Sequence, residues 1–179
     1  SIDLKRFESF KHRTFQYSDT LYFIEFFQRH YRSNHSLETA FTHGLNGTDL
    51  TVENGLNGFY SYFFDSEWAP ERTKKHIASP KKNSACKRIN MFLRWMVRKD
   101  EAGVDFGLWS SIKPSQLVCP LDVHAMRTAS QLGLMIEEKA NWKTALALTE
   151  TLRSLDPNDP VKYDFALYGM GIEDKTLWK

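Results

Sequence analysis

Apolar residues recur at intervals of three and four through most of the chain, which is the spacing of one face of an α-helix. Ser18 precedes such a run that continues to about residue 30, and Ser36 precedes a shorter run over residues 37–41. Serine is a favoured N-cap residue, so a helix is expected to follow each of them. A third run, at residues 52–65, predicts another helix.

The pattern weakens and then resumes in the middle of the chain. Residues 66–83 contain two prolines and are predicted to form a loop with one helical turn. Ser84 is expected to cap a helix that continues to about residue 98, because apolar residues line one face of that segment. Residues 99–119 contain glycines and a proline and are predicted to be a connecting loop.

The last third of the chain predicts three more helices. Asp122 precedes a helix that should end at Gly133, and Asn141 precedes a helix that should end before Asp156. Asp159 followed by proline opens the last one. No segment alternates strictly between apolar and polar residues, so strands are not expected. The prediction is an all-α bundle of about seven helices that forms a single unit over residues 1–179.

Composition narrows the class of protein. The chain has 179 residues, of which 41% are hydrophobic and 14% aromatic, which is enough apolar material for a folded core. No apolar run approaches membrane-spanning length and no signal peptide is visible, so no membrane partner is expected. Two cysteines cannot make a disulfide framework, so a reducing, cytoplasmic compartment is expected. The only cysteines, Cys86 and Cys119, lack metal-ligand spacing, as do the six histidines. No metal, iron–sulfur cluster or other cofactor is therefore expected.

Charge is distributed unevenly. Residues 71–99 contain ten basic residues and one acidic residue, a net charge of +9, whereas the whole chain carries +2 and the remainder therefore −7. A basic stripe on an otherwise acidic protein is the electrostatic footprint of a polyanion-binding surface. A helix face that is merely solvated is the alternative interpretation.

Two residues are candidate catalytic residues: Lys87, within the basic segment 71–99, and Asp122, which follows that segment in the chain. Asp122 is placed as an N-cap, where the free N–H groups of residues 124 and 125 and the helix dipole favour its ionised form. Lys87 is placed in a first helical turn near Lys81, Lys82 and Arg88, which disfavours its charge and favours a neutral, nucleophilic amine. A plain cap and a solvated lysine are the simpler alternatives.

Lys87-Arg88-Ile89-Asn90 and Pro120-Leu121-Asp122-Val123-His124 together resemble the helix-hairpin-helix DNA glycosylases, the superfamily of endonuclease III and the oxoguanine glycosylases. The first is similar to a Lys-Thr-Ala-Asn motif and the second to a Pro-Val-Asp-Val-His motif. The glycine-rich hairpin that precedes the lysine in that superfamily is absent here. Residues 90–98 and 159–167 resemble more closely an uncharacterised bacterial family, domain of unknown function 2400, whose members tend to extend further at the N-terminus. N-terminal helices of the bundle are then expected to be missing.

The resemblance implies a monomeric base-excision repair enzyme that acts on double-stranded DNA with a damaged base, in the bacterial cytoplasm. Within a core region at residues 84–132, Lys87 would attack C1′ of an extruded nucleotide, and Asp122 would stabilise the charge on the sugar. The Schiff base would then permit strand cleavage, and an oxidised purine such as 8-oxoguanine is the expected substrate. The base would be held by Asp164, Tyr168 and Met91. The DNA backbone would be held by His124, Lys81, Lys82, Arg88 and Arg127.

Two other functions fit the same sequence. One is a helical module of the same fold that binds nucleic acid without catalysis, which the absent glycine hairpin favours. The other is a domain that binds protein partners through its aromatic-rich N-terminal helices, at residues 23–27 and 59–64.

Overall fold

The computed structural model describes residues 4–136 and 139–173. This part of the chain is mostly helical, which confirms the all-α prediction. Its α-helices are α1 (Tyr17–Tyr31), α2 (Glu38–Thr42), α3 (Glu53–Phe63), α4 (Lys87–Val97), α5 (Val123–Gln131), α6 (Trp142–Leu155) and α7 (Asp164–Glu173). Its short 3₁₀-helices are η1 (Leu4–Phe7), η2 (Glu71–His76), η3 (Pro80–Lys82), η4 (Pro114–Gln116) and η5 (Pro160–Tyr163).

Several helix ends lie where the capping residues predicted them. The Asn141 Oδ1 atom accepts the Thr144 N–H at 3.0 Å and begins α6. Asp122 caps α5 in the same way, through the Ala125 N–H alone. Gly133 follows α5 with a φ of 69°, the left-handed conformation that glycine adopts at low cost.

The helix starts predicted from serine caps differ from those in the structure by two residues or fewer. The helix predicted after Ser18 starts at Tyr17, because the Asp19 carboxylate accepts the Gln16 N–H at 2.8 Å and closes the first turn earlier. The helix predicted to be capped by Ser84 starts only after Cys86. The Ser84 hydroxyl accepts the Cys86 N–H at 3.2 Å and forms a turn instead.

One element contradicts the prediction that strands are absent. Strands β1 (Lys11–His12) and β2 (Phe15–Gln16) pair antiparallel, with Lys11 opposite Gln16, and form a short hairpin. Arg13 occupies its two-residue turn with a φ of 55°. Strands of two residues are too short to show alternation, so the sequence pattern could not reveal them.

Aromatic side chains from α1 and α3 form the N-terminal core. Phe26, Phe59 and Phe63 are 0–5% exposed, and the rings of Phe26 and Phe63 lie 4.4 Å apart between centroids. The Tyr22 hydroxyl donates to the Phe63 carbonyl oxygen at 2.8 Å. The three phenylalanine rings therefore pack α1 against α3 and are covered, whereas Phe27 on the same helix as Phe26 is 38% exposed.

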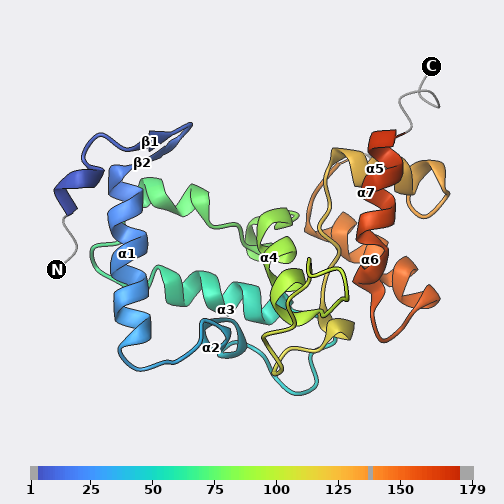
Figure 1. Cartoon of the computed structure of the whole chain (residues 1–179), viewed down its shortest axis with the longest axis horizontal. Helices are drawn as coiled ribbons and strands as arrows, with labels where there is room; N and C mark the ends of the chain where they lie inside the picture. Colours follow the sequence, from blue (N-terminus) through green and yellow to red (C-terminus); the bar gives the residue numbers. More distant parts are fainter. Residues whose placement is uncertain (1–3, 137–138, 174–179) are drawn as a thin grey trace.

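Figure 1 shows α1 and α3 in one half of the molecule and α5, α6 and α7 in the other, with α4 between them. Helix α5 packs against α7, and α2 packs against α3. In the ranges that the structure describes, no helix is both long and apolar enough to cross a bilayer.

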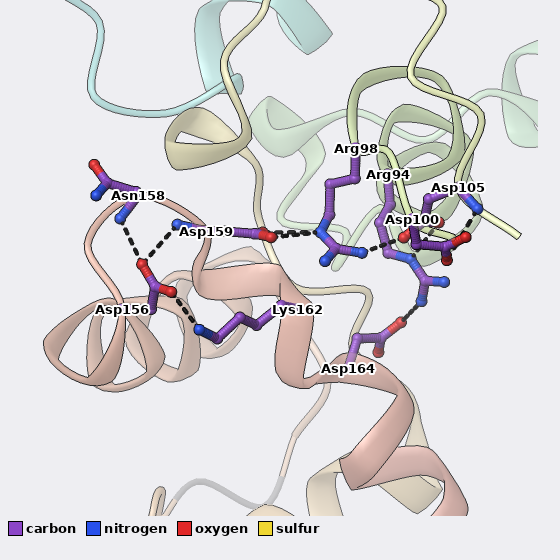
Figure 2. Close-up of polar contacts among 9 residues, drawn as sticks. All are labelled: Arg94, Arg98, Asp100, Asp105, Asp156, Asn158, Asp159, Lys162 and Asp164. Atoms are coloured by element: carbon purple, nitrogen blue, oxygen red, sulfur yellow. Dashed lines mark hydrogen bonds and ion pairs between the residues drawn. The ribbon is translucent and has the colours of Figure 1, made fainter. Parts of the chain in front are cut away.

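Buried ion pairs connect α4 to the C-terminal half (Figure 2). The Arg94 guanidinium, 2% exposed, donates to Asp105 through Nε at 3.0 Å and to Asp164 through Nη1. Arg98 donates to Asp105 and, through Nε at 2.8 Å, to Asp159. These arginines belong to the basic segment 71–99 but pair with carboxylates inside the protein, so they do not contribute to the predicted basic stripe.

Candidate functional site

Lys87 and Asp122 lie 35 residues apart in the chain and meet in space. Lys87 is the first residue of α4, and Asp122 is the N-cap of α5. The Lys87 Nζ atom donates to Asp122 Oδ2 at 2.6 Å, while Asp122 Oδ1 accepts the Ala125 N–H at 2.8 Å. The cap bond therefore fixes the carboxylate and leaves its second oxygen directed at the lysine.

The environment keeps Asp122 ionised. Burial raises the pKa of its carboxyl, but the hydrogen bonds from Lys87 and Ala125 together outweigh burial and hold the pKa below its usual value. The Asp122 side chain is 14% exposed, whereas that of Lys87 is 42% exposed. A ligand can therefore reach the amine, and the carboxylate lies directly behind it.

The turn that leads into α4 has an unusual backbone. Asn83 and Cys86 adopt left-handed φ angles of 53° and 51°. Asparagine tolerates this conformation better than most residues, so the sharp turn before Lys87 forms without glycine. Cys86 is 1% exposed, and burial raises the pKa of its thiol to about 11. It is thus a buried structural residue and not a thiolate nucleophile at neutral pH.

The Lys87–Asp122 contact lines a cavity of about 320 Å³, called here the Lys87 cavity. Its volume lies within the range of small-ligand sites. Predicted base-binding residues Met91, Asp164 and Tyr168 line the same cavity, so the structure brings these three together with both predicted catalytic residues. The cavity lies where α4 meets α5 and α7.

Sequence reasoning missed Arg94, Trp95 and Phe165, which also line the Lys87 cavity. Arg94 and Trp95 follow Lys87 by seven and eight residues, so the helical period could have placed them on the face that carries Lys87. The Arg94 guanidinium lies over the Phe165 ring, 3.8 Å from its centroid. This contact and the two ion pairs fix Arg94 rigidly at the cavity wall.

Asp164 differs from the expectation of a free hydrogen-bonding acid. Its Oδ2 atom accepts from Arg94, and the residue is 7% exposed. Burial raises the pKa of Asp164 above its usual value, although the neighbouring Arg94 lowers it. Among the described residues, its Oδ1 atom accepts no hydrogen bond, so one oxygen is left for a ligand in the cavity.

A second hollow of about 780 Å³, called here the basic groove, adjoins the Lys87 cavity and shares Lys87 and Met91 with it. No Asp or Glu is among the residues that line it. Its cationic lining residues are Arg13, Lys74, Lys75, Lys82, Lys87 and Arg88. The groove therefore brings together cations from the N-terminal hairpin, η2, η3 and α4.

The predicted backbone-binding residues separate into two sets. Lys82 and Arg88 line the basic groove, although Lys82 also donates to the Tyr60 hydroxyl at 2.5 Å. Lys81, His124 and Arg127 are exposed and line neither hollow. The His124 ring lies edge-on to Tyr168, 6.4 Å between centroids, and so stands beside the Lys87 cavity.

Asn57 is a further residue that sequence reasoning missed. Its Oδ1 atom accepts the Ser79 hydroxyl at 2.9 Å and the Lys81 N–H at 3.1 Å. These bonds tie η3 to α3 and hold Lys81 and Lys82 in place. In the described ranges, no group of three or more His, Cys, Asp or Glu side chains is arranged to hold a metal ion.

Comparison with known proteins gives one assignment. No curated protein and no solved structure matches the chain. A family model described as protein of unknown function (DUF2400) matches residues 1–173, nearly the whole chain. This match confirms the closer of the two resemblances found in the sequence. The chain therefore belongs to the DUF2400 family of proteins.

Proposed function

We propose that the protein is a DNA glycosylase with abasic-site lyase activity that removes an oxidised purine such as 8-oxoguanine. The observation that carries this proposal is the 2.6 Å contact between Lys87 Nζ and Asp122 Oδ2 at the wall of the Lys87 cavity. An amine held against an ionised carboxylate beside a small-ligand cavity suits covalent catalysis at a sugar carbon. The proposed helix-hairpin-helix fold rests on the motifs around these two residues.

The first step transfers the Lys87 ammonium proton to Asp122, for which the hydrogen bond provides a direct path. The amine then forms a bond to C1′ as the bond between C1′ and the base breaks, and the base leaves with that electron pair. Asp122 returns its proton to the departing base and becomes a carboxylate again. Its negative charge stabilises the positive charge that develops on the sugar.

In the second step the lone pair of the Lys87 nitrogen forms a double bond to C1′ as the C1′–O4′ bond breaks. O4′ keeps that electron pair and takes up the proton that the nitrogen loses, and a Schiff base between C1′ and Lys87 results. Loss of a proton from C2′ then expels the 3′ phosphate and nicks the strand. Asp122 lies close enough to the Lys87 nitrogen to exchange protons with the groups around it. One carboxylate thus serves base removal and strand cleavage.

The walls of the Lys87 cavity suit an extruded base. Met91 and Tyr168 offer apolar and aromatic surface for stacking, and Asp164 Oδ1 offers an acceptor for an N–H of a purine edge. Lys82 and Arg88 in the adjoining basic groove would hold phosphates of the strand. Lys81, His124 and Arg127 are exposed, and in this proposal they would contact the DNA backbone outside these hollows.

A non-catalytic nucleic-acid-binding module is the second candidate. Lys87 is paired with Asp122, and Asp164 is paired with Arg94, so both acids already serve as structural partners. The basic groove by itself would be sufficient for such a module.

Strand cleavage of end-labelled duplexes, with and without alkali, separates these candidates. Alkali reveals abasic sites left by base removal, whereas a nick without alkali reports lyase chemistry. The wild-type protein should nick an 8-oxoguanine strand without alkali. Lys87→Gln should lose that nicking and keep most of its affinity for duplex DNA. Lys113→Gln removes an exposed cation that lines neither hollow and serves as the matched control.

Asp122→Asn is the sharpest variant, because asparagine still caps α5 and only the charge is lost. We expect its single-turnover rate to fall by about 100-fold or more, as when a group that stabilises transition-state charge is removed. The proposal would fail if the folded wild-type protein bound duplex DNA but released no base from 8-oxoguanine or other damaged duplexes and did not nick abasic DNA. That result would favour the non-catalytic module.

A further inference from the structure

We propose that the N-terminal β-hairpin is a DNA clamp in which Arg13, with Lys75 and Arg88, binds backbone phosphates of the strand that enters the basic groove. This inference rests on the proposed function for the identity of the partner as DNA. It assigns a role to the hairpin and to two cations, Arg13 and Lys75, that the sequence did not single out.

The three cations come from distant segments and converge. Arg13 lies in the hairpin turn, Lys75 in η2 and Arg88 in the first turn of α4. All three line the basic groove and also a third hollow, of about 430 Å³, that adjoins it. They therefore stand together between two hollows, and each is exposed to solvent.

Within the described ranges, no acidic side chain pairs with these cations. In the part of the chain that the structure describes, the side chains of Arg13, Lys75 and Arg88 form no ion pair, and no Asp or Glu lines either hollow. Their neighbours behave differently, since Arg72 pairs with Asp19 and Lys74 with Glu71. Clustered like charges repel one another unless an anion is bound between them, so this arrangement favours a polyanionic ligand.

The hairpin is held firmly enough to act as a clamp. The Arg72 Nη2 atom donates to the Thr14 carbonyl oxygen at 3.1 Å. The Phe15 ring packs edge-on against His76 and Phe23, with centroids 4.9 and 5.3 Å apart. The backbone at Arg13 is thus held beside η2, so less backbone freedom is lost when its side chain binds a phosphate.

The backbone conformation of Arg13 is a further sign that its side chain has a function. A left-handed φ is unfavourable for arginine, and glycine or asparagine would suit the turn better. An arginine at this position works against the local preference of the backbone. Such local inconsistencies are typical of functional sites.

DNA backbone is the partner that the groove fits. The basic groove leads to Lys87, which it shares with the Lys87 cavity. A strand whose extruded nucleotide occupies that cavity would place its neighbouring phosphates in the groove. Contacts of lysine and arginine with phosphates position a duplex without reading its sequence.

The test measures duplex affinity by fluorescence anisotropy across a series of KCl concentrations, with an undamaged duplex and a duplex that contains a stable abasic-site analogue. Arg13→Asn removes the charge and keeps a residue that tolerates the left-handed turn. Lys75→Gln tests the second cation. Arg13→Lys restores the charge, and Lys113→Gln is the control. Thermal melting shows that each variant is folded.

Arg13→Asn and Lys75→Gln should each lower the slope of log K against log salt by about 0.9, the value for one lost phosphate contact on B-DNA. The loss of affinity should be equal for both duplexes. Arg13→Lys should recover most of it, and Lys113→Gln should match the wild type.

Wild-type slopes and affinities in folded Arg13→Asn and Lys75→Gln would overturn the clamp, even if Lys87→Gln abolished strand cleavage and so supported the proposed function. Failure of the enzymatic proposal alone would give a different result. Reduced slopes in these variants of a protein that cleaves no duplex would keep the clamp and remove the enzymatic proposal.

Discussion

At the scale of single residues, Asp122 is both a helix cap and a partner of the candidate nucleophile, two roles that the sequence left as alternatives. Its Oδ1 atom caps α5 and its Oδ2 atom accepts from Lys87. Structural and chemical roles are therefore compatible in one carboxylate. The cap bond sets the orientation that the contact with Lys87 requires, which is a direct form of preorganisation.

Replacement of Asp122 separates its two roles in stability. Asp122→Ala removes the cap acceptor and should lower the free energy of unfolding by about 1 kcal/mol relative to Asp122→Asn, which keeps that acceptor. Urea denaturation at neutral pH measures the difference. Equal stabilities of the two variants would show that the Ala125 N–H bond does not support α5.

The pH dependence of stability provides a second test of Asp122. Its pKa in the folded protein is lower than its ordinary value of 3.8, so the unfolded state binds the proton first as the pH falls. The stabilisation is complete well above pH 3.8 and is lost as the pH falls through the folded pKa. Wild-type stability should therefore decline more steeply below about pH 5 than that of Asp122→Asn. Parallel declines in urea denaturation would contradict the pKa shift.

At the scale of elements, α4 organises the molecule. Its first residue carries the candidate nucleophile, and the face that continues through Met91, Arg94 and Trp95 lines the Lys87 cavity. Arg94 ties α4 to α7 through Asp164 and to the loop before η4 through Asp105 (Figure 2). The geometry of the candidate site therefore depends on these buried ion pairs.

Arg94→Leu should destabilise the protein strongly, because it leaves the carboxylates of Asp105 and Asp164 buried without this partner. We expect a loss of about 3–5 kcal/mol in the free energy of unfolding, typical of a broken buried ion pair. Arg88→Ala removes an exposed cation from the same helix and should change it by less than about 0.5 kcal/mol. Denaturation at neutral pH measures both variants. A loss below about 1 kcal/mol in Arg94→Leu would show that the network is replaceable by apolar packing.

At the scale of the whole molecule, local signals predicted most of the architecture. The helical periodicity and the caps at Asp122 and Asn141 depend on neighbours within four residues, so they could be predicted from the sequence. The start of α4 was misplaced, because Ser84 forms a turn and the helix begins after Cys86. The hairpin was missed, because its two-residue strands leave no alternating pattern.

Contacts between residues far apart in the chain limited how much of the candidate site could be predicted from the sequence. Lys87 and Asp122 were found through the motifs around them, and the structure places them in contact. Arg94 and Arg98 were counted with the surface cations, because an arginine on a helix gives no local sign of burial. Their acidic partners Asp105, Asp159 and Asp164 are 7 to 70 residues away, and only the tertiary fold brings these charges together.

The central claim is that Lys87 is the nucleophile, and borohydride trapping followed by peptide mapping tests it most directly. Borohydride reduces a Schiff base to a stable bond between protein and DNA. The wild-type protein should form this adduct on an 8-oxoguanine duplex, the mapped attachment site should be Lys87, and Lys87→Gln should form none. An adduct mapped to another amine, or no adduct on either 8-oxoguanine or abasic duplexes under conditions where the folded protein binds them, would contradict the account.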